Sequence, residues 1–143
     1  MEWVITGESL VAGRGEGAAL VAAEPLSFWG GYDSRTGEII DRHHPLSGRI
    51  AAGRVLAVPF SRGSSTTTAV LLEAVRRGTA PAAILTTGHD TFFALAAVVA
   101  QEMYGQSPPV VRIGQQDLAA LATGDHVTID AAGAIRVRRV TSA

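Results

Sequence analysis

The strongest constraint on the fold is an alternation of strands and helices in the middle of the chain. Apolar, β-branched runs predict strands over 54–59, 82–86 and 110–113, and apolar residues at helical spacing predict helices over 64–77 and 91–104. Gly78 follows the first helix as a C-cap, and Asp90 precedes the second as an N-cap. Because the links are short, the three strands are expected to be parallel and joined by right-handed crossovers.

The segments on either side of this parallel unit predict antiparallel strands. The expected elements are strands over 2–6 and 18–23, a short helix over 115–122, and a hairpin of 124–130 and 134–140. A chain of 143 residues is expected to form one domain, residues 1–143. The predicted fold class is α/β, a parallel βαβαβ unit with flanking antiparallel strands. In this fold a β layer packs on a mixed sheet that carries helices on its other face.

Two segments allow either a structural or a functional interpretation. The connection from Pro25 to Ser47 is long and rich in turn residues, which is typical of functional loops but also of a flap that covers a sheet edge. The second helix is apolar on every face from Phe92 to Ala100, as in a helix that is buried on all sides. Either the sheet and a loop of this chain enclose that helix, or another chain covers one side.

Composition excludes several kinds of chemistry. The chain has no cysteine, and all 12 of its basic residues are arginine. It therefore has no disulfide, no thiol nucleophile, no cysteine ligand for an iron–sulfur cluster, and no lysine for a phosphate loop or a Schiff base. A net charge of −1 gives no sign of a nucleic-acid or membrane partner. Without a signal sequence or an apolar stretch of about 20 residues, the protein is expected to be soluble and cytoplasmic.

The segment from Pro59 to Thr68 carries the strongest local signal of a site. It follows a predicted parallel strand and begins a helix, so it lies at the carboxyl edge of the sheet, where open α/β folds bind ligands. Gly63 permits close approach of the backbone, while Arg62 and the helix N-terminus favour an anion. A serine or threonine before a helix is usually an N-cap, but capping explains one hydroxyl and not five in succession.

The histidines are weaker candidates for a site. His89 and Asp90 follow the next parallel strand and are expected near the serine segment, although Asp90 is also a natural helix cap. His43 and His44 lie near Asp41, but two adjacent histidines rarely point at one metal ion. No metal site is therefore predicted on this chain.

Several blocks together resemble one known family. They are Phe28 to Asp33 (Phe-Trp-Gly-Gly-Tyr-Asp), Thr36 to Asp41, His44 to Gly48, Arg62 to Ser65 (Arg-Gly-Ser-Ser), and Arg77 to Ile84. In this order they are similar to the small subunit of aconitase X, and the resemblance covers nearly the whole chain. It implies the swivelling β/β/α domain of aconitases, in agreement with the layers predicted above.

The resemblance also implies roles for individual residues. In aconitases the first serine of a Gly-Ser-Ser loop is the catalytic base, which here is Ser64, with Arg62, Gly63, Ser65 and Thr66 expected to bind the substrate. A serine hydroxyl is a weak acid, and helix N–H groups together with Arg62 would lower its pKa. Asp33, His44 and His89 are further candidate site residues.

The family places its iron–sulfur cluster on cysteines of a large subunit, so this chain is expected to bind no cofactor and to need that partner. The expected reaction is the removal of water from a small hydroxy acid, either cis-3-hydroxy-L-proline, which the composition slightly favours, or 5-phosphomevalonate. The sequence departs from the family at Ser61, preceded by Phe60, where glycine is usual.

Two other interpretations remain open. A phosphohistidine-type swivelling domain would need a reactive histidine on a loop, for which His89 is the candidate. A non-catalytic binding module would keep the fold and act without a large subunit.

Overall fold

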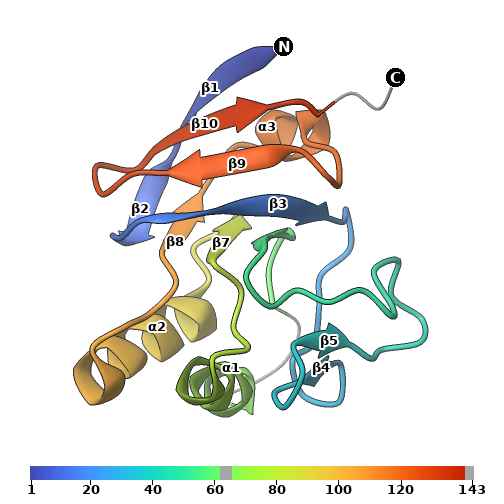
Figure 1. Ribbon diagram of the computed structural model, residues 1–143, viewed down its shortest axis with the longest axis vertical. Coiled ribbons are helices and arrows are strands. Elements are labelled where there is room, and N and C mark those ends of the chain that lie inside the picture. Colours follow the sequence, from blue (N-terminus) through green and yellow to red (C-terminus); the bar gives the residue numbers. More distant parts are fainter. Residues whose placement is uncertain (62–65, 141–143) are drawn as a thin grey trace.

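The computed structural model describes residues 1–61 and 66–140, which form three layers (Figure 1). The strands are β1 (Glu2–Thr6), β2 (Glu8–Val11), β3 (Gly15–Val21), β4 (Tyr32–Asp33), β5 (Glu38–Ile39), β6 (Val55–Ala57), β7 (Ala83–Thr86), β8 (Val110–Arg112), β9 (His126–Ile129) and β10 (Ala134–Arg138). The helices are α1 (Thr66–Arg77), α2 (Thr91–Tyr104) and α3 (Gln115–Ala120). One layer contains β1, β9 and β10, the middle layer contains the parallel strands, and α1 and α2 form the third.

The strand order β1-β10-β9-β3-β6-β7-β8-β2 confirms the predicted mixed sheet. Strands β3, β6, β7 and β8 pair in parallel, and β1, β10, β9 and β3 pair antiparallel. The segment 18–23 was expected to form an antiparallel strand only, and this is wrong in part, because β3 pairs in parallel with β6 as well as antiparallel with β9. Strand β3 therefore belongs to both parts, and the sheet folds over on itself. The β/β/α fold class expected from the sequence is therefore correct.

Alternating side chains of the parallel strands fill two cores, one on each face of the sheet. Leu20, Leu56 and Ile84 point toward α1 and α2, whereas the neighbouring residues Val55 and Leu85 point toward the layer of β1, β9 and β10. Both sets are fully buried. Strands buried on both faces are typical of a parallel sheet, and this explains why their sequences are apolar without alternation.

Helix α2 begins and ends where the sequence predicts. One of the two alternatives for its surroundings, enclosure by the sheet and a loop of this chain, is wrong. The Asp90 carboxylate accepts hydrogen bonds from the first turn, and Gly105 ends the helix in the left-handed conformation. Within this chain the helix is not enclosed on all sides. Leu95, Val98 and Met103 are 53%, 49% and 61% exposed, so sheet and loop do not sandwich it.

The turn-rich connection between β3 and β6 supplies core residues and is more than a flap over a sheet edge. Phe28 stacks on Tyr32 with ring centroids 4.6 Å apart and meets Phe93 of α2 edge-on at 5.2 Å. The Tyr32 hydroxyl donates to the Thr79 carbonyl oxygen at 2.7 Å, and burial raises its pKa. A side chain at Gly31 would collide with the backbone of Ser27, which explains a glycine at this position.

Helix α3 is attached to the hairpin β9–β10 through the buried Asp125. Its carboxylate accepts from the Ala122 N–H at 2.9 Å and from the Arg139 guanidinium at 3.2 Å, and Arg139 also donates to the Ala120 carbonyl oxygen. Burial raises the pKa of Asp125, but the hydrogen bonds from Arg139 and Ala122 outweigh it, so the pKa lies below its ordinary value.

We expect Asp125 to stabilise the fold at neutral pH and to lose this contribution in acid. A carboxyl with a lowered folded pKa contributes fully above its unfolded value of about 3.9, and the contribution falls as the pH drops through the folded pKa. Urea unfolding from pH 7 to pH 3 should therefore show a steeper loss of stability in the unsubstituted chain than in Asp125→Asn. Parallel pH profiles of the two proteins would contradict this role of Asp125.

Among residues 1–61 and 66–140, no helix is both long and apolar enough to cross a membrane.

Candidate functional site

The segment that the sequence singles out, Pro59 to Thr68, begins after β6 at the carboxyl edge of the parallel strands and includes the first residues of α1. Strand β6 ends at Ala57, and α1 begins at Thr66. Four of the predicted site residues, Arg62, Gly63, Ser64 and Ser65, lie outside the described residues. The surroundings of this segment are therefore defined by Pro59 to Ser61 before it and by α1 after it.

Backbone hydrogen bonds fix Pro59 to Ser61 on two sides. The Thr87 N–H, just after β7, donates to the Pro59 carbonyl oxygen at 3.0 Å. On the other side, the Leu26 N–H donates to the Phe60 carbonyl oxygen at 3.3 Å, and Leu26 and Ser61 form an isolated parallel bridge. The backbone that leads into the predicted site is therefore fixed by hydrogen bonds on both sides.

Asp90 adds the tightest contact of this region. Its carboxylate accepts from the Ser61 N–H at 2.6 Å and from the Ser61 hydroxyl at 2.8 and 3.0 Å. The same carboxylate accepts from the N–H groups of Phe92 and Phe93 at 3.1 and 3.0 Å. Asp90 is only 7% exposed, so these bonds are shielded from water.

Asp90 is therefore both the N-cap of α2 and a link to the residue before the serine segment. The structure shows Asp90 in contact with Ser61, the residue that precedes that segment in the chain, so a role as a cap alone is too narrow. Ser61, the position at which this sequence differs from the pattern of the family it resembles, supplies the hydroxyl of this link. A glycine there would keep the N–H bond and lose the hydroxyl bonds.

Three threonines form the first turn of α1. Thr66, a predicted binding residue, is the first residue of the helix and is half-buried. The hydroxyls of Thr67 and Thr68 are buried, and within the described part of the chain neither has a hydrogen-bond partner. The N–H groups of a first helical turn have no partner inside the helix, so this end of α1 favours negative charge.

The remaining candidates have different partners. Asp33 accepts from the side chain and N–H of Arg35, whose hydrogen bonds hold the pKa of Asp33 below its ordinary value. His44 is buried, accepts from the Leu46 N–H and contacts the Glu24 carbonyl oxygen at 3.3 Å, which is a structural role.

His89 is exposed, and its Nε2 lies 2.8 Å from a Glu8 carboxylate oxygen. It also lines a shallow hollow with Ser61 and Asp90, so it lies at the same edge of the sheet as Ser61.

This chain lacks the cysteine ligands that an iron–sulfur cluster needs. It contains no cysteine at any position, and its described residues include no group of three His, Asp or Glu side chains that could hold a metal ion. No catalytic step is therefore assigned to such a group on this chain.

Comparison with known proteins gives a consistent result. The family model for the aconitase X swivel domain matches residues 4–137. A cis-3-hydroxy-L-proline dehydratase of Pseudomonas aeruginosa is 51% identical over 119 residues, which cover 82% of this chain and 20% of that protein. This chain thus spans about a fifth of the length of the cis-3-hydroxy-L-proline dehydratases it matches.

Other relatives are closer to this chain in length. The phosphomevalonate dehydratase small subunit of Methanothermobacter thermautotrophicus is 39% identical, with 83% of this chain and 87% of that one covered. A crystal structure of Thermococcus kodakaraensis aconitase X matches with a TM-score of 0.85 at 29% identity, covering 96% of this chain and 99% of that chain.

Proposed function

Since this chain belongs to the aconitase X swivel-domain family, we propose that it is the small-subunit part of a dehydratase that removes water from a small hydroxy acid. The observation that carries this proposal is the match over residues 4–137, together with relatives that are named dehydratases. The proposed location is the cytoplasm. The proposed partner is a large subunit, because several relatives of similar length are named small subunits.

We assign the iron–sulfur cluster of the enzyme to that large subunit, since this chain has no cysteine to bind one. When bound there, the cluster would supply a Lewis acid for the leaving hydroxyl. The proposed contribution of this chain is the base and part of the binding site for the substrate.

Ser64 is the proposed base. In the elimination it would take a proton from a carbon of the substrate while the hydroxyl leaves from the neighbouring carbon. Ser64 precedes the first residue of α1 by two positions, and the N-terminus of a helix stabilises negative charge. Arg62, Gly63, Ser65 and Thr66 are proposed to bind the carboxylate of the substrate.

We propose Asp90 as a positioning residue for this base. It does not touch the substrate in this scheme. It holds Ser61, three residues before Ser64, through the N–H and hydroxyl contacts described above. A base must lie within hydrogen-bond reach of the proton it removes, so a fixed entry to the segment favours the correct geometry.

The proposed substrate is cis-3-hydroxy-L-proline, because the relatives with this name include the one with 51% identity. The alternative is 5-phosphomevalonate, supported by the small subunits that match most of their own length. Assay of the complex with both compounds separates the two.

We expect the purified chain to be inactive without the large subunit, because it has no cysteine to hold the cluster that would accept the leaving hydroxyl. The measurement is an anaerobic dehydratase assay of the chain alone, of the large subunit alone, and of their mixture, with both substrates. Activity is expected only in the mixture. Rapid dehydration by the chain alone would contradict the two-subunit scheme.

A further inference from the structure

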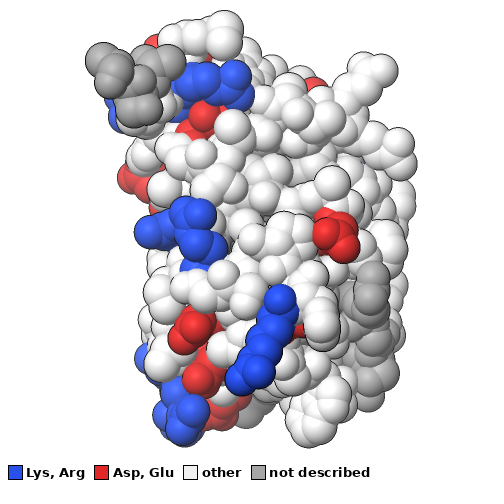
Figure 2. Space-filling view, turned by 90° about the vertical axis from the view of Figure 1, so that its right-hand side faces the viewer, with Lys and Arg blue, Asp and Glu red and all other residues white. Residues whose placement is uncertain are grey.

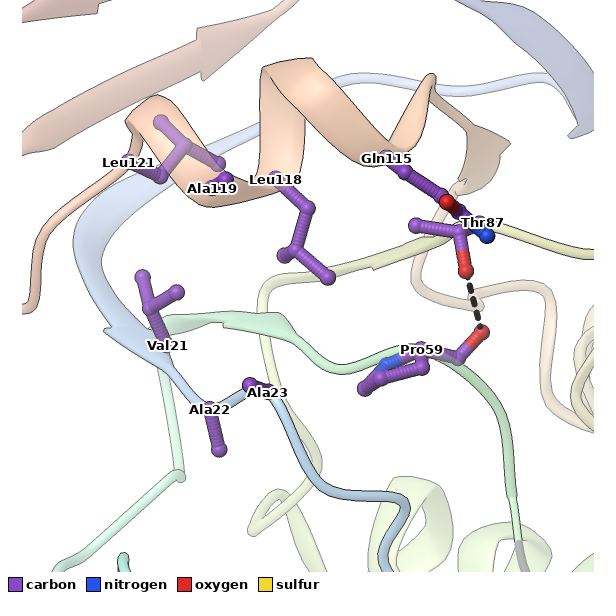
Figure 3. A pocket seen from close by; sticks show the side chains of 9 residues that line it. All are labelled: Val21, Ala22, Ala23, Pro59, Thr87, Gln115, Leu118, Ala119 and Leu121. Atoms are coloured by element: carbon purple, nitrogen blue, oxygen red, sulfur yellow. Dashed lines mark hydrogen bonds between the residues drawn. The ribbon is translucent and has the colours of Figure 1, made fainter.

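A cavity of about 480 Å³ lies between α3 and the ends of the strands (Figure 3). Leu118 points from α3 into this space above Pro59, and Val21 faces it from the end of β3. Leu118 and Leu121 are 7% and 6% exposed, so the wall that they form is apolar and well packed, while Ala119 is exposed and lies at the rim.

The walls of this cavity are held in place. The Thr87 hydroxyl donates to the Pro59 carbonyl oxygen at 3.3 Å, which joins two walls (Figure 3). Helix α3 is attached to the rest of the domain by Asp125 and Arg139. A preformed apolar cavity is suited to binding because little ordering is needed when it is filled.

The lining indicates what kind of group the cavity would accept. None of the described residues around it is charged, and its two polar side chains are Thr87 and Gln115. The Thr87 hydroxyl is already bonded to Pro59. Among these described residues a hydroxy acid would find no cation for its carboxylate, whereas an aromatic or branched aliphatic side chain would be buried favourably.

The position of the cavity identifies what would supply such a side chain. Pro59 and Thr87 lie at the same strand ends as Ser61 and Asp90, so the cavity shares the carboxyl edge of the sheet with these two residues, and Ser61 precedes the proposed base by three positions in the chain. Figure 2 shows the face toward which β3 runs in Figure 1, with charged side chains mainly to the left and below and a broad uncharged area at its centre. A partner that completes the active site has to cover the carboxyl edge of the sheet.

We propose that the cavity between α3 and the strand ends is a docking socket for an apolar side chain of the large subunit. The inference rests on the proposed function, because that function supplies the partner and its place over this edge. Buried apolar anchors in well-packed pockets commonly dominate the binding energy of an interface.

The test compares the same substitution at two neighbouring positions of α3. Ala119→Arg places a long charged side chain at the cavity, whereas Ala120→Arg adds the same charge at an exposed residue that does not line it. Arginine is a good helix former, so both variants should unfold near the temperature of the unsubstituted chain. Titration of each labelled chain with the large subunit should give a Kd at least about 10-fold higher for Ala119→Arg and unchanged for Ala120→Arg.

The outcomes separate this inference from the proposed function. If both variants bind the large subunit with the Kd of the unsubstituted chain, or if both Kd values rise equally, the proposed docking socket is wrong. The proposal of a two-subunit enzyme is not affected by that result. If the unsubstituted chain does not bind the large subunit at all, the proposed function fails and the socket with it. Sedimentation of the chain alone tests a second copy as the occupant. A dimer that Ala119→Arg disperses would overturn the proposal.

Discussion

Ser64→Ala is expected to reduce kcat of the complex with the large subunit by at least about 100-fold, the lower end for loss of a general base. The hydroxyl removed is the proposed proton acceptor, and alanine offers no substitute. KM should change little, because the proposed binding groups remain. The measurement is steady-state dehydration by the anaerobic complex, with the protein concentration corrected for folded chain.

The matched control is Ser65→Ala, which removes the neighbouring hydroxyl and leaves the proposed base. Ser65→Ala should lower kcat less than Ser64→Ala does. It should raise KM more, because Ser65 is proposed to bind the substrate. If these serines served only as helix caps, each variant would lose about 1 kcal/mol of stability and the surviving protein would turn over normally. Ser64→Ala with most of its activity would therefore remove Ser64 as the base.

Much of the fold could be predicted because its signals are local. The limits of α2 follow from Asp90 at its start and Gly105 at its end, and both act on neighbouring residues in the chain. The parallel strands are recognisable because both of their faces are buried, which requires continuous apolar runs such as Val55–Ala57. Their parallel direction then follows from the short strand–helix–strand connections.

Strand β2 was not predicted, because its reason to form lies elsewhere in the chain. Residues Glu8–Val11 contain a charged residue and a serine and carry no strong strand signal of their own. They pair with β8, about a hundred residues later, and Glu8 lies 3.0 Å from the Arg112 guanidinium. A local sequence pattern cannot predict a strand whose pairing partner lies so far away in the chain.

The same reasoning separates the predictable parts of the site from the others. The position of the serine segment at a strand end follows from topology alone. The bond between Ser61 and Asp90 joins residues 29 positions apart, and the sequence indicated only that they would be neighbours. The docking cavity was missed altogether, because α3, β3 and two strand ends contribute apolar residues that each have an ordinary place in a core.

Within the aromatic block of the family resemblance, the sequence could not distinguish packing from function. Phe28 and Tyr32 are buried and stack on each other, whereas Trp29 between them is 70% exposed. A shared motif therefore contains both core residues and a surface residue, and only the structure assigns each.

Asp90→Ala is expected to lower the stability of the isolated chain by about 3 kcal/mol. It removes the cap of α2, worth about 1 kcal/mol, and leaves the buried Ser61 N–H without its acceptor, which costs about 1–3 kcal/mol. For a chain of this size the loss corresponds to a fall in Tm of roughly 10 °C. Thermal unfolding followed by circular dichroism measures it.

Asp90→Ser separates the two roles of this residue. Serine is a good N-cap, so it should restore the bonds to Phe92 and Phe93 and recover about 1 kcal/mol of the stability lost in Asp90→Ala. Its shorter side chain cannot also reach Ser61, so kcat of the complex should stay about 10-fold or more below that of the unsubstituted enzyme, with KM less affected. Ser61→Ala, which keeps the N–H bond to Asp90, should be milder in both measurements. If Asp90→Ser instead turns over at the unsubstituted rate, Asp90 caps α2 and does not position the base.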